Sequence, residues 1–216
     1  MKNYRYVLFD LDGTLTESGE GIINSAVYAL KKFSIEPEMS TMTKFLGPPL
    51  KDSFRDFYGF DDEKCEQAVK YYREYYTTKG IFENRVYEGV EDCLKMLSEA
   101  GLHLAVATSK PQVFAVKILE HFHLAQYFDY IGGAELDGSR SVKADVIVHT
   151  LKNCGVNDRS QVIMAGDRYH DVLGAKALGI DCIGMLYGYG TREELSQAGA
   201  VYIAETPLEA AKWLLG

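Results

Sequence analysis

Short apolar runs alternate with amphipathic stretches along most of the chain. The runs that have the length and apolar character of buried strands are residues 6–11, 102–108, 127–131, 161–165, 181–185 and 200–203. Between them, apolar residues recur at helical spacing over residues 90–100, 112–121, 142–153, 171–178 and 207–215. This alternation is typical of parallel βαβ units, so we predict an α/β fold with a Rossmann-like parallel sheet core and helices on both faces.

The segment 16–82 has a different pattern, with helical periodicity and no convincing strand. Its predicted helices cover residues 19–33, 41–46, 50–58 and 61–79, and the prolines that follow Gly47 separate two of them. We therefore expect a small all-helical domain, residues 16–82, inserted after the first strand. The α/β core would then consist of residues 1–15 and 83–216.

A stripe of tyrosines lies in the last of these predicted helices. Tyr71, Tyr72, Tyr75 and Tyr76 form two pairs at i,i+4 spacing. Such a stripe most often packs inside its own domain, which is the favoured interpretation. A self-association surface and a wall that faces substrate remain alternatives.

The net charge of the chain limits the kinds of partner that it can bind. The formal net charge is −8, from 23 basic and 31 acidic residues, and no window gathers a dense run of lysine and arginine. Nucleic acid and membrane surfaces are therefore disfavoured as partners, whereas a small anionic substrate can bind through local donors or a metal ion.

The 4 cysteines stand far apart, and no apolar run reaches the ~20 residues of a membrane-spanning helix. We expect a cytoplasmic protein without a signal peptide, as a monomer or a homodimer.

The first predicted strand ends in two carboxylates, Asp10 and Asp12, followed by Gly13. Side chains two residues apart on a strand point to the same side, so both acids face one place at the carboxyl end of the strand, where open α/β sheets bind ligands. Gly13 allows a sharp turn that leaves the carbonyl of residue 12 facing the same cavity. Two such carboxylates need either a cation between them or a shared proton.

A second acidic pair, Asp167 and Asp171, follows the predicted strand 161–165. Their i,i+4 spacing places both side chains on one side of a first helical turn. Mg²⁺ prefers oxygen ligands and commonly takes one or two carboxylates together with substrate phosphate. Two acidic pairs at the ends of two parallel strands therefore predict a Mg²⁺ site.

Two further strand ends offer groups that bind phosphate. Thr108 and Ser109 follow an apolar run, where hydroxyls and backbone N–H groups near a helix start can hold phosphate oxygens. Lys143, at the opening of another predicted helix, supplies a positive charge that could neutralise the acidic cluster and a transferring phosphoryl group. These groups are suited to phosphoryl transfer.

Four segments resemble, in order along the chain, the four motifs of the haloacid dehalogenase-like (HAD) hydrolase superfamily. They are FDLDGTL, TSK, the lone Lys143 and AGDRYHD. The helical insertion after the first motif is similar to the cap of the phosphoglycolate phosphatase-like branch. The segment YGYGTREEL, after the last motif, is similar to that branch as well.

The resemblance implies a role for each matching residue. Asp10 would be the nucleophile that forms an aspartyl-phosphate, and Asp12 would act as general acid and base while its carbonyl contacts the metal. Asp167 would bind the metal directly, and Asp171 would bind it through water or orient Lys143. The substrate would be bound by Thr108, Ser109 and the turn at Gly13.

Within this family the sequence favours a Mg²⁺-dependent phosphatase for a small phosphate monoester, because the namesake dehalogenases lack the acid at Asp12. The substrate could be phosphoglycolate, a nucleoside monophosphate, pyrophosphate or an aryl phosphate such as phosphotyrosine. The cap would close over the core, and its loop from Gly47 to Lys51 would read the leaving group. A solvated lysine is the alternative for Lys51.

Other functions remain possible at this stage. A sugar-phosphate mutase keeps Asp12, but such mutases carry basic residues beside the cap-loop glycine, where this chain has Leu46 and Pro48. A receiver-type phosphorylation switch also uses acids, a hydroxyl and a lysine at strand ends, in a different order. A catalytically silent binding protein is a third alternative, and the role of His170 is open.

Overall fold

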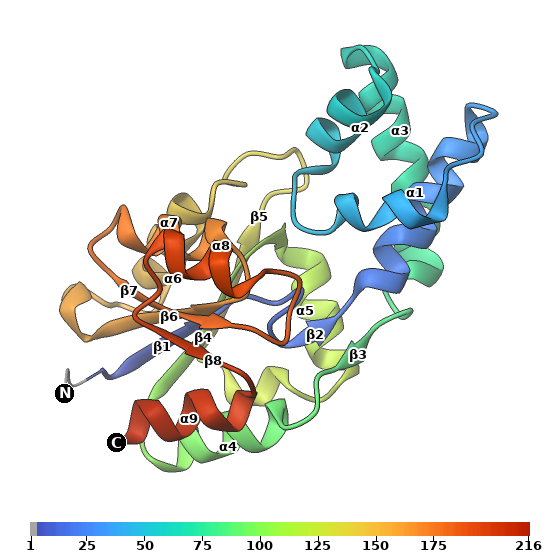
Figure 1. Ribbon diagram of the computed structural model, residues 1–216. Coiled ribbons are helices and arrows are strands. Elements are labelled where there is room, and N and C mark those ends of the chain that lie inside the picture. The colour runs from blue at the N-terminus through green and yellow to red at the C-terminus, as the bar shows by residue number, and fades with distance from the viewer. Residues whose placement is uncertain (1–3) are drawn as a thin grey trace. The chain divides into compact units, whose positions relative to one another are not determined.

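The computed structural model describes residues 4–216, which form two compact units. The core unit contains residues up to Thr16 and from Val86 onward, and the helical unit is Glu17–Arg85. At the centre of the core unit lies a six-stranded parallel sheet (Figure 1). In spatial order its strands are β5 (Tyr130–Ala134), β4 (His103–Pro111), β1 (Tyr6–Phe9), β6 (Val162–Gly166), β7 (Asp181–Met185) and β8 (Tyr202–Ala204). The predicted α/β fold with a helical insertion is confirmed.

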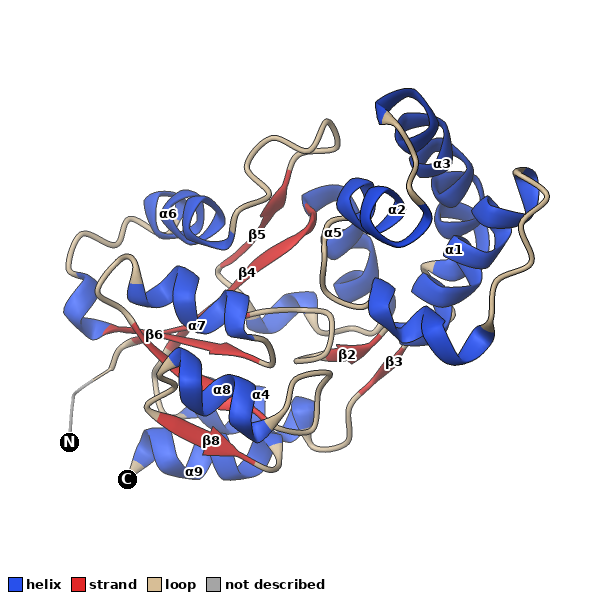
Figure 2. Ribbon diagram, turned by 45° about the horizontal axis from the view of Figure 1, so that its top comes forward, coloured by secondary structure: helices blue, strands red, loops and turns tan. Residues whose placement is uncertain are grey.

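Helices cover both faces of this sheet (Figures 1 and 2). One face of the sheet carries α6 (Lys143–Asn153), α7 (Tyr169–Lys176) and α8 (Arg192–Ala198). On the other face, α4 (Val90–Glu99) and α9 (Pro207–Leu215) pack together. The helix α5 (Gln112–His121) packs against β4 and β5. Leu8, Met164 and Cys182 of the sheet form one buried cluster with Ile147 and Val172 of the helices. Within residues 4–216, no helix combines the length and the apolar character needed to cross a membrane.

The central strand β1 fixes where the chemistry can lie. It pairs in parallel with β4 and β6, and Phe9 lies opposite Val106 on one side and Ala165 on the other. The residues that follow these three strands therefore emerge side by side at the carboxyl edge of the sheet.

The helical unit consists of α1 (Gly19–Lys32), the 3₁₀ helix Met39–Phe45, α2 (Leu50–Tyr58), α3 (Asp62–Tyr75) and the π turn Tyr76–Gly80. The chain leaves the core unit through β2 (Thr16–Glu17) and returns through β3 (Arg85–Val86), which pair with each other. Tyr72 and Tyr76 are only 5% and 2% exposed and stack with ring centroids 5.4 Å apart. These two tyrosines of the stripe therefore pack inside the unit. Tyr71 and Tyr75 are half-buried, against Phe33 and Tyr28.

Some element boundaries differ from the sequence prediction. The strand expected over 127–131 begins at Tyr130, because Ala125–Tyr127 forms a 3₁₀ turn. The helix expected over 171–178 begins at Tyr169, because the side chain of Asp171 accepts a hydrogen bond from the N–H of Arg168 and caps its start. The helix α8 was not predicted, because its 7 residues are too few for a clear periodicity.

Candidate active site

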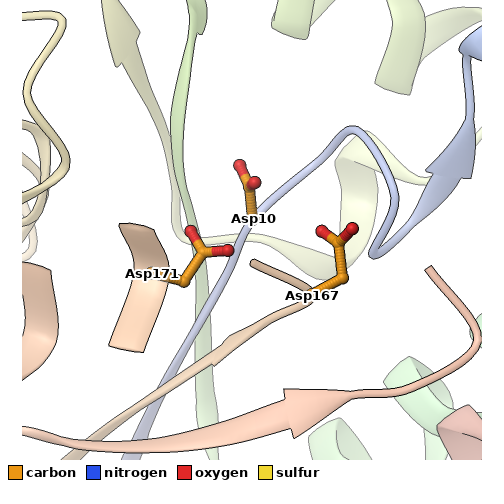
Figure 3. A group of neighbouring side chains, drawn as sticks. All are labelled: Asp10, Asp167 and Asp171. Carbon is orange, nitrogen blue, oxygen red and sulfur yellow. The ribbon is translucent and has the colours of Figure 1, made fainter. Parts of the chain in front are cut away.

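Three carboxylates meet at the carboxyl edge of the sheet. Asp10 follows β1, Asp167 follows β6, and Asp171 lies in the first turn of α7. One oxygen of each lies within 4.8 Å of an oxygen of the other two, and Figure 3 shows the three side chains directed into one space. Asp167 and Asp171 are 0% and 1% exposed. The structure thus brings together the side chains of three of the four residues predicted to bind metal, and the fourth, Asp12, is predicted to do so through its carbonyl.

Lys143 links two of these acids. Its Nζ lies 2.9 Å from Asp10 Oδ1 and 2.7 Å from Asp171 Oδ1, and it donates a hydrogen bond to the carbonyl of Ala107 at 3.0 Å. Gly174 of α7 permits this position, because a Cβ on it would lie 2.8 Å from the Cβ of Lys143. Burial lowers the pKa of Lys143, but the two carboxylates outweigh it and hold that pKa above its ordinary value. The lysine therefore stays charged.

Two acids of the site, Asp10 and Asp167, have raised pKa values. Burial raises the pKa of Asp10 to about 6, against the attraction of Lys143 and with the repulsion of Asp171. Burial and the repulsion of Asp171 and Asp10 raise the pKa of Asp167 well above its ordinary range. Hydrogen bonds from the Tyr189 N–H (2.8 Å) and the Thr14 hydroxyl (3.1 Å) only partly offset this effect. The site is short of positive charge.

Asp12 lies in a different environment. Its Oδ2 lies 2.5 Å from Nζ of Lys110, and the two side chains are 23% and 7% exposed. Its Oδ1 is buried and has no hydrogen-bond partner among residues 4–216. Asp12 therefore has a basic partner that lies 98 residues away in sequence. The contact of its carbonyl with a metal stays a prediction.

The predicted phosphate-binding residues differ in exposure. Thr108 is 2% exposed, and its hydroxyl lies beside Asp10 and lowers the pKa of that carboxyl. Ser109 is exposed next to it. Gly13 has a φ of 84°, and a Cβ on it would lie 2.2 Å from Oδ2 of Asp167, so no other residue fits this turn. Thr108 and Gly13 thus contact the acidic residues directly, while the binding of substrate by Ser109 stays a prediction.

The last three candidate residues are Gly47, Lys51 and His170. Gly47, with a φ of 109°, and Lys51 belong to the helical unit, where exposed Lys51 pairs with Glu66 at 3.0 Å. Their contact with substrate stays a prediction. His170 is half-buried with its ring 3.8 Å from that of Tyr169, and burial lowers its pKa.

Sequence reasoning missed Lys110, Thr14 and Tyr189. Lys110 directly follows Thr108 and Ser109, so its position within the second motif was a usable signal. Thr14 lies within the first motif, but the sequence does not reveal that its hydroxyl reaches Asp167. Tyr189 acts through its backbone N–H, which every residue except proline has, so its residue type carried no signal.

Residues 7–185 match the family of haloacid dehalogenase-like hydrolases. The chain belongs to this family. The resemblance of its four motifs is therefore confirmed, and a receiver-type switch loses its support.

Similar proteins narrow the class further. A 5′-nucleotidase of Pseudomonas aeruginosa is 45% identical over 193 residues, which cover 89% of this chain and 87% of that protein. The crystal structure of a predicted phosphatase from Clostridium acetobutylicum has a TM-score of 0.93 at 51% identity and covers 98% of both chains. The tyrosine-protein kinase PtkA of Mycobacterium tuberculosis is 39% identical over 198 residues, which cover 91% of this chain and 67% of that protein. The chain is an enzyme, a phosphatase of the haloacid dehalogenase-like family.

Proposed function

We propose that this enzyme is a Mg²⁺-dependent phosphatase that hydrolyses small phosphate monoesters through an aspartyl-phosphate on Asp10, with nucleoside 5′-monophosphates as preferred substrates. The observation that carries the proposal is the meeting of Asp10, Asp167 and Asp171 beside Lys143. The substrate class is supported by the 45% identity to the 5′-nucleotidase of P. aeruginosa.

The residues present fit a hard divalent cation. All three side chains of the cluster offer carboxylate oxygens, and the ammonium group of Lys143 contacts two of them. Burial, together with repulsion between the acids, raises the pKa values of Asp10 and Asp167, and a bound cation would favour their ionised forms. Asp10, Asp167 and the carbonyl of Asp12 would hold Mg²⁺, and Asp171 would orient Lys143. When bound, the ion neutralises phosphate oxygens and orients the ester.

The two steps of hydrolysis use the side chains of Asp10 and Asp12. A carboxylate oxygen of Asp10 attacks phosphorus, the bond to the ester oxygen breaks, and protonated Asp12 gives its proton to that oxygen. Water then attacks phosphorus, ionised Asp12 takes a proton from the water, and the bond between Asp10 and phosphorus breaks. Phosphate leaves, and both acids return to their starting states. Lys110 fixes the position of Asp12 by donating a hydrogen bond to Oδ2, which accepts it in both protonation states while the proton is carried on Oδ1.

Phosphoryl transfer to a tyrosine hydroxyl instead of water is a second candidate function. The observation that favours it is the 39% identity to PtkA over 91% of the chain. The same aspartyl-phosphate would serve both reactions, so the acceptor distinguishes them. A sugar-phosphate mutase is disfavoured by the apolar residues that flank Gly47.

A panel of phosphate esters with Mg²⁺ tests the proposal. We expect steady phosphate release, with the highest kcat/KM for nucleoside 5′-monophosphates and lower values for phosphoglycolate, pyrophosphate, phosphotyrosine and sugar phosphates. Release that is fastest from another ester would contradict the substrate class. Labelled phosphate that accumulates on tyrosine, with no release, would favour the kinase alternative, and interconversion of sugar phosphates would favour a mutase.

Mg²⁺ should raise the melting temperature of the protein, and the gain should increase with pH. The pKa of Asp10 rises from its ordinary value of 3.8 to about 6 in the folded chain, and that of Asp167 rises as well, so folding loses stability as the pH increases through this range. Mg²⁺ binds the ionised carboxylates and removes this loss. Calorimetric scans with and without Mg²⁺ at about pH 5 and about pH 8 measure the two gains. Equal gains at both pH values would refute this explanation of the raised pKa values.

A further inference from the structure

The loop that follows β7 packs directly against the acidic cluster. A Cβ on Gly188 would lie 2.2 Å from the carbonyl oxygen of Gly13 and 2.4 Å from the Cβ of Asp167. A Cβ on Gly190 would lie 2.0 Å from the carbonyl oxygen of Asp167. Both contacts are far shorter than a side chain can make, so the two glycines bring the backbone of this loop to the site.

Both oxygens of Asp167 accept hydrogen bonds, Oδ2 directly from this loop and Oδ1 from Thr14, which the loop holds. The N–H of Tyr189 donates to Oδ2 at 2.8 Å. The hydroxyl of Tyr187 donates to the carbonyl of Thr14 at 2.8 Å, and the hydroxyl of Thr14 donates to Oδ1 of Asp167 at 3.1 Å. The ring of Tyr187 packs edge-on against Tyr87, with centroids 5.0 Å apart. Tyr187 thus holds the turn whose hydroxyl orients Asp167.

The same segment also holds the start of α7. Oε1 of Glu194 accepts hydrogen bonds from Nε of Arg168 at 2.8 Å and from the N–H of Tyr169 at 2.9 Å. The N–H of Arg168 in turn donates to Oδ2 of Asp171 at 3.1 Å. Residues 187–194 therefore contact Asp167 directly and reach Asp171 through Arg168.

We propose that residues 187–194 are a positioning element for the metal ligands, in which Tyr187 and Glu194 set the orientation of Asp167 and Asp171. The inference rests on the proposed Mg²⁺ site. Groups that hydrogen-bond to metal ligands orient those ligands, and removal of such a group typically weakens metal binding by about 10- to 100-fold. Neither Tyr187 nor Glu194 would touch the ion or the substrate.

The test compares metal binding by the wild type with that by Tyr187→Phe, Glu194→Gln and Tyr202→Phe. Tyr187→Phe removes the bond to Thr14 and keeps the ring against Tyr87. Tyr202→Phe is the matched control, because it removes a tyrosine hydroxyl that bonds Glu209 on the core unit. The dissociation constants of Mg²⁺ and of Mn²⁺ are measured without substrate, by calorimetry and by the electron paramagnetic resonance signal of free Mn²⁺.

We expect the dissociation constant of Tyr187→Phe to rise by about 10-fold or more, that of Glu194→Gln to rise less, and that of Tyr202→Phe to match the wild type. At saturating Mg²⁺, kcat of Tyr187→Phe should approach the wild-type value, because the excess ion compensates for the weaker binding. Unchanged affinity in both Tyr187→Phe and Glu194→Gln would overturn the positioning role but leave the proposed phosphatase intact. A wild type that binds neither ion would overturn both.

Discussion

Asp10→Asn should lower phosphate release from the best ester by about 10⁴-fold or more, since loss of a catalytic nucleophile is among the costliest single changes in an enzyme. Asparagine has nearly the shape of aspartate and keeps one oxygen at the end of β1, but its amide does not attack phosphorus. Asp10 touches Thr108 and Lys143, so the change affects the reacting atom while leaving these neighbours in place. Steady-state kcat with saturating Mg²⁺ measures the effect.

The same variant separates chemistry from folding. Because burial raises the pKa of Asp10 to about 6, its ionised form costs stability at neutral pH, and a neutral amide avoids that cost. Metal-free Asp10→Asn should therefore melt at or above the temperature of the metal-free wild type. Asp92→Asn, at an exposed acid in the first turn of α4, is the matched control and should keep wild-type turnover. Near wild-type turnover in Asp10→Asn would refute the nucleophile assignment.

Much of the core unit is predictable because each βαβ unit reveals itself locally. The strand 181–185 and the helices 112–121 and 207–215 are predicted with the same bounds that the structure gives. Parallel strands are buried on both faces, so they appear as continuous apolar runs that do not depend on distant neighbours. The meeting of Asp10 with Asp167 follows from the same logic, since both residues end strands that lie side by side.

What the sequence does not reveal depends on contacts between distant segments. Nothing in the sequence around Gly188 indicates that this residue lies against Gly13 and Asp167. A backbone N–H such as that of Tyr189 is available at almost any residue. Lys110 looks like an ordinary surface lysine until the fold brings it to Asp12. The chemistry is therefore more predictable than the groups that orient it, because reacting residues have distinctive side chains and orienting groups need not.

Lys143→Met should destabilise the metal-free protein by about 3 to 5 kcal/mol, the usual cost of removing one partner of a buried ion pair. Methionine has a similar length and packs in the same space beside Gly174, so the main loss is the charge that faces Asp10 and Asp171. Lys152→Met, at an exposed lysine in the last turn of the same helix, is the matched control and should change stability little. Urea denaturation of the three proteins measures these differences.

The pH dependence identifies charge as the cause of the Lys143→Met effect. Without the ammonium group, the folded-state pKa of Asp10 should rise further above 6, while its unfolded value stays near 3.8. A raised folded-state pKa gives stability that is present at low pH and is lost as the pH rises, so the difference from wild type should be small at about pH 4 and should widen toward about pH 8. A constant difference across this range would instead indicate a packing defect. Turnover should fall at every pH by about 10²- to 10³-fold, because a charge that stabilises the transferring phosphoryl group is lost.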